Sequence, residues 1–109
     1  MSGIQPHPGL GAYSPAKAAL IMLCRQLAQE WGPQGIRTNC ICPGMIHTPL
    51  TEAIYRDAAV LRSRESMVPL GRIGVPDDYP GLVAFLASDD AAFMTGQTIS
   101  VSGGLTMHG

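Results

Sequence analysis

The chain alternates between two hydrophobic patterns, and this alternation is the strongest constraint on its fold. Apolar residues recur every three or four positions from Ser14 to Trp31 and again from Asp77 to Ser88, which is the spacing of one helical face. A short run rich in β-branched residues follows each of them, at Ile36 to Cys42 and at Gln97 to Val101, as expected of buried strands. The order helix, strand, helix, strand predicts an α/β fold. Two strands are too few for a complete doubly wound sheet.

Local signals mark where these elements begin and end. Ser14-Pro15 predicts an N-cap and a first-turn proline, and Gly32-Pro33 predicts the end of the first helix. Residues 45 to 70 have a mixed pattern. Met45 to Thr51 is typical of a loop, and Glu52 to Met67 of one or two weakly amphipathic helices. We expect this segment to be the mobile part of the chain.

Composition excludes several kinds of partner. Seven Lys+Arg residues against eight Asp+Glu give a net charge of −1, so we expect neither nucleic acid nor a membrane surface as a partner. The longest apolar stretch, Ala18 to Cys24, is far shorter than the roughly 20 residues of a membrane span. The first residues show no signal-peptide pattern, which favours a cytoplasmic protein.

The sequence predicts no metal site, because no Cys or His residues are spaced as metal ligands. The three cysteines are expected to be buried reduced thiols: Cys24, Cys40 and Cys42. The three histidines are expected to be solvated loop residues: His7, His47 and His108.

A tyrosine and a lysine four residues apart are the clearest chemical pattern in the chain. Tyr13 and Lys17 stand across the start of the first predicted helix, so both side chains should lie on one face, about one turn apart. A nearby ammonium favours phenolate, so the pKa of Tyr13 should fall below ~10. Such a phenol can exchange a proton with a carbonyl or alcohol oxygen. The alternative is a solvated helix that carries the pair by chance.

Five segments in the same order resemble the short-chain dehydrogenase/reductase family. The resemblance covers essentially the whole chain and rests on these segments: Pro8 to Leu20, with the Tyr-Ser-Pro-Ala-Lys motif; Ile36 to Gly44; Ile46 to Thr48; Pro69 to Asp78; and Thr95 to Gly104. It implies that the chain is the C-terminal portion of one Rossmann-like, doubly wound parallel domain, in the order helix, strand, lid, helix, strand, with the N-terminal half absent.

The resemblance implies an NAD- or NADP-dependent oxidoreductase that interconverts a secondary alcohol and a carbonyl in a small molecule. Tyr13 would be the general acid/base. Lys17 would activate Tyr13 and hydrogen-bond the nicotinamide ribose. No residue in this chain distinguishes NAD from NADP, because the family residue that does so follows an earlier strand.

The loop after the first strand would contact the nicotinamide in such an enzyme. Pro43 and Gly44 would bring the backbone close to the ring, Ile46 would offer backbone groups to the carboxamide, and Thr48 a hydroxyl to the carboxamide or diphosphate. The alternative is that Pro43-Gly44 is only a strand-ending turn. Asn39 is expected to be a structural hydrogen-bonding residue.

By the same resemblance, residues 45 to 68 would form a substrate lid. Four apolar lid residues would face substrate, or else serve ordinary packing: Met45, Leu50, Ile54 and Met67.

Family features that this chain lacks lead us to expect that residues 1–109 alone are inactive. The glycine-rich phosphate loop has no counterpart, and the family's catalytic serine would precede Met1, so Ser2 is not its match. Ser102 replaces an aspartate of many relatives, and a turn hydroxyl can take the place of a turn carboxylate. Family members often assemble as homo-tetramers or dimers, so the alternative functions are a non-catalytic assembly module and an inactive remnant.

Overall fold

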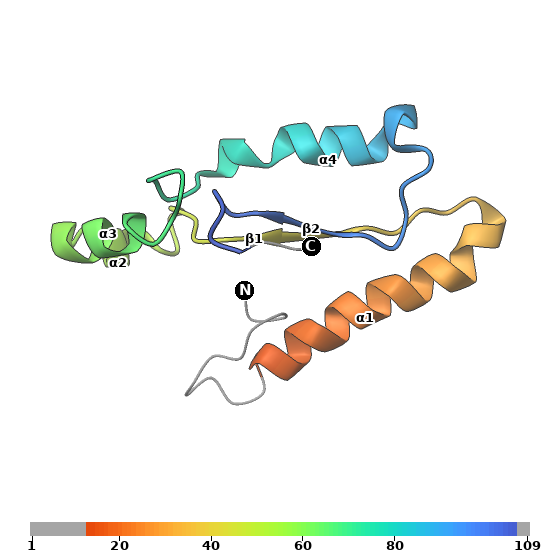
Figure 1. Cartoon of the computed structure of the whole chain (residues 1–109), viewed down its shortest axis with the longest axis horizontal. Coiled ribbons are helices and arrows are strands. Elements are labelled where there is room, and N and C mark those ends of the chain that lie inside the picture. The colour runs from red at the N-terminus through yellow and green to blue at the C-terminus, as the bar shows by residue number, and fades with distance from the viewer. Residues whose placement is uncertain (1–12, 107–109) are drawn as a thin grey trace. The chain divides into compact units, whose positions relative to one another are not determined.

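A long first helix dominates the N-terminal part of the protein. The computed structural model describes residues 13–106, and within the first helix it describes side chains from Pro15 onward. Helix α1 (Tyr13–Trp31) begins one residue before the predicted start, so Ser14 lies in its first turn and is not its N-cap. Figure 1 shows α1 as one unbroken helix. A 3₁₀ turn at Gly32–Gln34 follows, and Gly35 with φ 78° closes it, as Gly32-Pro33 predicted.

Two parallel strands pair in a single sheet, β1 (Cys40–Pro43) beside β2 (Thr98–Val101). The predicted strand over Ile36 to Cys42 is wrong in its first half, because residues 36–39 have no strand neighbour to pair with. Single hydrogen bonds hold them instead: the Gly96 N–H donates to the Thr38 carbonyl at 2.7 Å, and side-chain bonds add to it. The Asn39 amide donates to the Met94 carbonyl at 3.0 Å and accepts from the Gln97 N–H at 3.1 Å. Asn39 is therefore the structural residue that the sequence predicted.

The described residues fall into two compact units. The first holds residues 13–41 and 85–99, and the second holds residues 42–84 and 100–106. Helix α4 (Pro80–Ala87) runs from the second unit into the first. The predicted helix from Asp77 starts instead as a separate 3₁₀ turn at Pro76–Asp78, and the regular helix begins at Pro80, since proline is favoured in a first helical turn.

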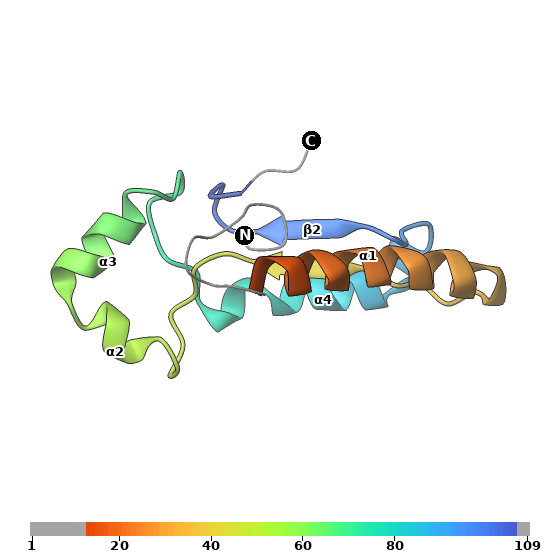
Figure 2. The ribbon, with the colours of Figure 1, turned by 90° about the horizontal axis from the view of Figure 1, so that it is seen from below.

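The second unit contains the predicted lid as two short helices joined by a bend, α2 (Glu52–Tyr55) and α3 (Ala58–Glu65), which Figure 2 separates clearly. The Asp57 carboxylate caps α3 by accepting from the N–H groups of Ala59 at 2.9 Å and Val60 at 3.3 Å. The prediction of one or two weak helices in this segment is confirmed.

Each unit has a small core of its own. In the first unit, α1 buries Ile21, Cys24 and Ala28, which recur at three and four residues along one face. Burial raises the pKa of the Cys24 thiol, and Cys40 nearby raises it further. The second core is a set of five residues: Cys42, Tyr55, Val68, Ile73 and Thr106.

None of the three cysteines forms a disulfide within the described part of the chain; Cys24 and Cys42 are buried and Cys40 is half-buried. Between residues 13 and 106, no helix combines the length and apolarity needed to cross a membrane. The predicted irregular segment 1–12, with Ser2 and His7, lies outside the described residues, as does His108.

Candidate functional site

The candidate proton-transfer pair lies at the start of α1. Tyr13 is the first residue of this helix and Lys17 follows one turn later, so both belong to one continuous helical segment of the first unit. The Lys17 side chain is exposed. The helix behind it is anchored where Ala28 packs against Gly96, at which a Cβ would stand 3.3 Å from the Ala28 methyl. The Tyr13 side chain lies outside the described atoms, so its role in proton transfer stays a prediction.

The candidate cofactor loop begins where β1 ends, in the second unit. The Gly44 N–H donates to the Val101 carbonyl at 3.2 Å, which continues the pairing with β2. A Cβ at Gly44 would stand 2.8 Å from the Ser102 Cβ and 2.9 Å from its Cα. Glycine is thus required here by the close approach of two backbones, a reason that the sequence did not reveal. Access to a nicotinamide stays a second, predicted reason.

Ile46 lies in extended backbone and forms an isolated parallel bridge with Gly74. The Gly74 N–H donates to the Met45 carbonyl at 2.9 Å, and the His47 N–H donates to the Gly74 carbonyl at 2.7 Å. Successive residues of an extended chain point their backbone groups to opposite sides, so the N–H and C=O of Ile46 face away from Gly74. One N–H beside one C=O is the donor and acceptor pair that a primary carboxamide matches, so this loop fits the group that the family implies.

Thr48 follows in the same loop, and its backbone carbonyl accepts from the Thr51 N–H at 3.0 Å. Its hydroxyl has only long contacts of 3.4 Å, to the Thr51 hydroxyl and the Thr51 N–H. Contacts of this length are weak. The Thr48 hydroxyl is therefore free to turn toward a bound group.

The lid carries exposed apolar side chains. Leu50 is 91% exposed, Met67 is 55% exposed and Ile54 is 42% exposed. Ordinary packing, which was one of the two expectations for these residues, is therefore wrong for Leu50 within the described part of the chain, whereas Ile54 and Met67 are partly buried there. Met45 is half-buried and lines a pocket. Contact of any of them with substrate stays a proposal.

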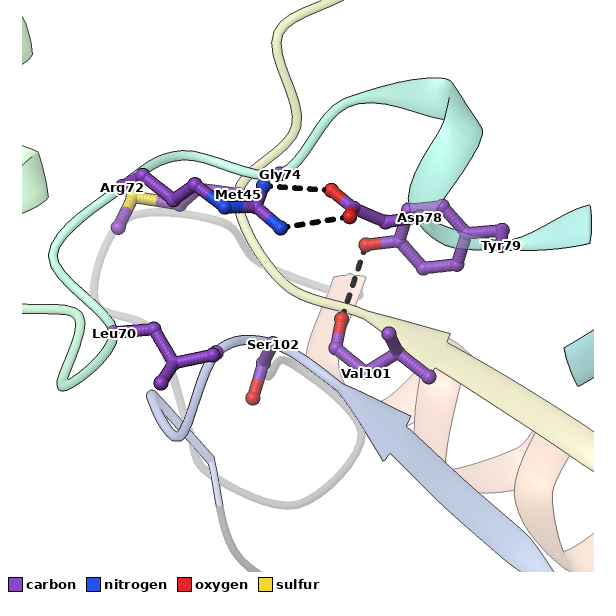
Figure 3. A pocket seen from close by; sticks show the side chains of 9 residues that line it. Met45, Leu70, Arg72, Gly74, Asp78, Tyr79, Val101 and Ser102 are labelled. Carbon is purple, nitrogen blue, oxygen red and sulfur yellow. Dashed lines mark hydrogen bonds and ion pairs between the residues drawn. The ribbon is translucent and has the colours of Figure 1, made fainter. Parts of the chain in front are cut away.

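A pocket of about 210 Å³ lies in the second unit, and Figure 3 shows its lining. Arg72 makes two hydrogen bonds of 2.8 Å to the two carboxylate oxygens of Asp78, and the Val75 N–H donates to the same carboxylate at 2.8 Å. The Tyr79 hydroxyl donates to the Val101 carbonyl at 3.0 Å. The sequence did not predict these contacts, because the pairing of Arg72 with Asp78 depends on the turn between them and Val101 is 22 residues from Tyr79.

These contacts shift the pKa values of both acidic groups. The Arg72 guanidinium, helped by the Val75 N–H, holds the pKa of Asp78 well below its usual range. Burial raises the pKa of Tyr79, and the Asp78 carboxylate raises it further. The Asp78 carboxylate and the Tyr79 hydroxyl thus already have partners within the protein, and these bonds join the start of α4 to the turn before it and to β2.

We predict that Asp78→Asn makes stability less sensitive to acid. Because the folded-state pKa lies below the unfolded value of ~3.9, the ion pair stabilises the protein above about pH 4 and is lost as the pH falls. The free energy of unfolding of the variant should therefore decrease less between pH 6 and pH 3 than that of the parent. Urea unfolding at the two pH values measures this. An equal decrease in both proteins would contradict the role of Asp78.

Ser102 begins the turn that follows β2. Its hydroxyl accepts from the Thr106 N–H at 3.1 Å and donates to the Thr106 carbonyl at 3.2 Å. Only a hydroxyl can do both, because an ionised carboxylate accepts alone. The predicted exchange of an aspartate for a turn hydroxyl is thus accommodated by an additional bond to the chain.

Among residues 13–106, no three His, Cys, Asp or Glu side chains are grouped closely enough to hold a metal ion. His47, predicted to be solvated, is half-buried, and its Nε2 lies 2.5 Å from a Glu52 carboxylate oxygen. Its ring also meets the ring of Tyr55 edge-on, with centroids 5.4 Å apart. His47 lies in a loop with its side chain 39% exposed, so the prediction of a solvated loop histidine is confirmed in part, and the contacts with Glu52 and Tyr55 arise because α2 folds back onto this loop.

Comparison with known proteins identifies the class to which this arrangement belongs. A family described as enoyl-(acyl carrier protein) reductase matches residues 1–106. A tropinone reductase homolog of Arabidopsis thaliana is 45% identical over 109 residues, which are all of this chain and 36% of the relative. Dehydrogenase/reductase SDR family member 4 of Bos taurus is 37% identical over 108 residues, 99% of this chain and 39% of the relative.

Solved structures agree. A 4-hydroxyisoleucine dehydrogenase complexed with NADH superimposes with a TM-score of 0.91 at 40% identity, over 96% of this chain and 43% of that one. A putative 2-deoxy-d-gluconate 3-dehydrogenase from Agrobacterium tumefaciens with bound NADP superimposes with a TM-score of 0.88 at 36% identity, over 95% of this chain and 42% of that one.

The fold is thus the C-terminal part of a Rossmann-type α/β domain. The chain belongs to the short-chain dehydrogenase/reductase family, and it spans less than half the length of these relatives.

Proposed function

We propose that this chain supplies the proton-transfer and nicotinamide-side residues of an NAD- or NADP-dependent oxidoreductase that interconverts a secondary alcohol and a carbonyl. The observation that carries the proposal is the placement of Tyr13 and Lys17 one turn apart in α1 of a chain that matches the family over residues 1–106. When bound, the cofactor supplies or accepts a hydride. The residues of this chain would donate and accept the proton.

In the proposed reaction, the Tyr13 hydroxyl gives its proton to the carbonyl oxygen during reduction and takes it back during alcohol oxidation. The Lys17 ammonium stabilises the phenolate and hydrogen-bonds the nicotinamide ribose. The ammonium is exposed and keeps the long, flexible stem that lets it reach two partners.

The loop after β1 would orient the nicotinamide. The backbone of Pro43 and Gly44 passes beside the ring, the N–H and C=O of Ile46 pair with the carboxamide, and the Thr48 hydroxyl reaches the carboxamide or diphosphate. Support comes from the direction of the Ile46 backbone and from the weakly bonded Thr48 hydroxyl. The structures with bound NADH and NADP that this chain resembles make either cofactor a reasonable partner.

The substrate would be a small molecule that meets the apolar lid over residues 45–68. Support comes from the exposure of Leu50, Ile54 and Met67. Exposed apolar side chains on a soluble surface mark a place where something apolar binds. Closure over substrate would bury this surface and exclude water from the reacting atoms.

A second candidate is an assembly module without activity of its own. Leu20, Met22 and Leu23 on α1 are between 51% and 58% exposed, which favours burial against another subunit, as in a homo-dimer or homo-tetramer. The exposed face alone fits both candidates, since an oligomeric enzyme also needs an assembly surface, so activity is what distinguishes them.

The test is to express residues 1–109 alone and fused behind a glycine-rich N-terminal half from a family member, called here the joined form. Absorbance of the reduced nicotinamide is then followed over a panel of secondary alcohols and ketones with both cofactors. We expect no turnover from residues 1–109 alone and measurable turnover from the joined form. Full activity of residues 1–109 without the N-terminal half would contradict the proposal that this chain supplies only part of the active site. A folded joined form that neither binds nor turns over either cofactor would favour the assembly module.

A further inference from the structure

Thr51 occupies the N-cap position of α2 without capping it. An N-cap threonine normally accepts a hydrogen bond from the second or third N–H of its own helix. Here the side chain makes no such bond to α2. The hydroxyl turns back toward the preceding loop, where it donates to the Ile46 carbonyl at 2.7 Å and accepts from the Thr48 N–H at 2.9 Å.

These two bonds are the shortest that the hydroxyl makes, and they join backbone groups two residues apart. A hydroxyl has one proton to donate and lone pairs to accept with, so a single side-chain oxygen fixes both peptide units at once. The Ile46 carbonyl has two lone pairs and can accept a second donor. The bond from Thr51 therefore orients this carbonyl without blocking it.

Gly74 holds the other side of the same loop. Its backbone bonds to the Met45 carbonyl at 2.9 Å and to the His47 N–H at 2.7 Å hold two successive peptide units. The second of these units also carries the Ile46 carbonyl, to which Thr51 donates from the other side. The loop is thus bonded on both edges. The Gly74 edge uses backbone alone, whereas the Thr51 edge depends on one hydroxyl that a substitution can remove.

The first turn of α2 adds a second contact to this loop. Glu52, the residue after Thr51, places its carboxylate 2.5 Å from His47 Nε2. Arg56 lies 3.8 Å from the other Glu52 oxygen. The ring of Tyr55 in α2 lies beside His47, and Arg64 of α3 lies over that ring at 5.6 Å. The loop and the start of the lid are therefore one connected structure.

We propose that Thr51 is a positioning residue for cofactor binding: its hydroxyl orients the Ile46 carbonyl that would pair with the nicotinamide carboxamide, holds the backbone of Thr48 beside it, and ties that orientation to the lid. The inference rests on the proposed function of the loop. Preorganisation of this kind lowers the ordering cost of binding. The proposed role of Thr51 concerns only the nicotinamide end of the cofactor.

Hydrogen exchange tests the structural half of the inference in the joined form. Thr51→Val keeps the shape of the side chain and removes the hydroxyl, and Thr51→Ser restores it. We expect the Thr48 amide to exchange about tenfold faster in Thr51→Val and at the parental rate in Thr51→Ser. The His47 amide, bonded to Gly74, is the internal control and should not change. Faster exchange of the Ala53 and Ile54 amides alone would show an ordinary helix cap and overturn the inference.

Cofactor binding tests the functional half. Fluorescence titration should show that Thr51→Val weakens binding of reduced NAD or NADP by about tenfold and that Thr51→Ser restores parental affinity. ADP-ribose lacks the nicotinamide, so it should bind Thr51→Val and the parent equally well. Equal weakening of ADP-ribose, or no weakening of either ligand, overturns the positioning role. If the parental joined form binds no reduced cofactor, the proposed function fails and this half fails with it, while hydrogen exchange still decides whether Thr51 orders the loop.

Discussion

Tyr13→Phe in the joined form is expected to lower turnover by about 1,000-fold, because the change removes the hydroxyl that exchanges the proton and leaves the ring in place. Affinity for reduced cofactor should change little, since Lys17 and the loop after β1 remain. Steady-state rates measured beside a fluorescence titration of the cofactor separate the two effects.

Tyr79→Phe is the matched control for this substitution. It also removes one phenolic oxygen, but that hydroxyl donates to the Val101 carbonyl and has no part in the proposed chemistry. We expect turnover to be retained and the free energy of unfolding to fall by about 1 kcal/mol. An unchanged rate in Tyr13→Phe, with the control behaving as stated, would remove Tyr13 as the acid/base and with it the proposed mechanism.

Gly44→Ala is expected to destabilise the protein by roughly 1–3 kcal/mol or to prevent folding, as overpacking does. The added methyl would stand under 3 Å from both the Cβ and the Cα of Ser102, and backbone cannot swing aside as a flexible side chain can. To make room for the methyl, β1 would have to move away from β2 at the point where the candidate cofactor loop begins. Urea unfolding of the joined form measures the loss.

Gly81→Ala provides the comparison for that change. Gly81 lies in α4 with nothing within 4 Å of its Cβ position, so the same added methyl should be neutral or should stabilise the helix by about 0.5–1 kcal/mol. If Gly44→Ala and Gly81→Ala unfold at the same urea concentration, the close backbone approach at Ser102 is not a constraint on the fold.

The proposals for Tyr13 and for Thr51 depend on different atoms and can fail separately. The role of Tyr13 requires only a phenol near the reacting carbon. The role of Thr51 requires that the loop be ordered before the cofactor binds. A protein in which Tyr13→Phe is inactive and Thr51→Val behaves as the parent would keep the reaction and lose the preorganisation.

Local patterns along the chain determined the main elements and the candidate chemistry. The apolar period of α1, the stop at Gly32-Pro33 and the weak helices of the lid follow from interactions between residues a few positions apart. The four-residue spacing of Tyr13 and Lys17 is likewise a local property, and so is the order of segments that led to the family.

Only the tertiary structure decided which residues meet across the chain. The strand at β1 is shorter than its sequence pattern because a ladder exists only where β2 lies beside it. Gly44 is required by a residue 58 positions later, and Asp78 pairs with Arg72 because a turn brings them together. Thr51 stands at the N-cap position of α2, yet its hydroxyl donates to a carbonyl in the loop before the helix. Sequence periodicity indicates which side of a helix or strand is apolar. The roles of Gly44, Asp78 and Thr51 depend instead on distances between residues that exist only after the chain has folded.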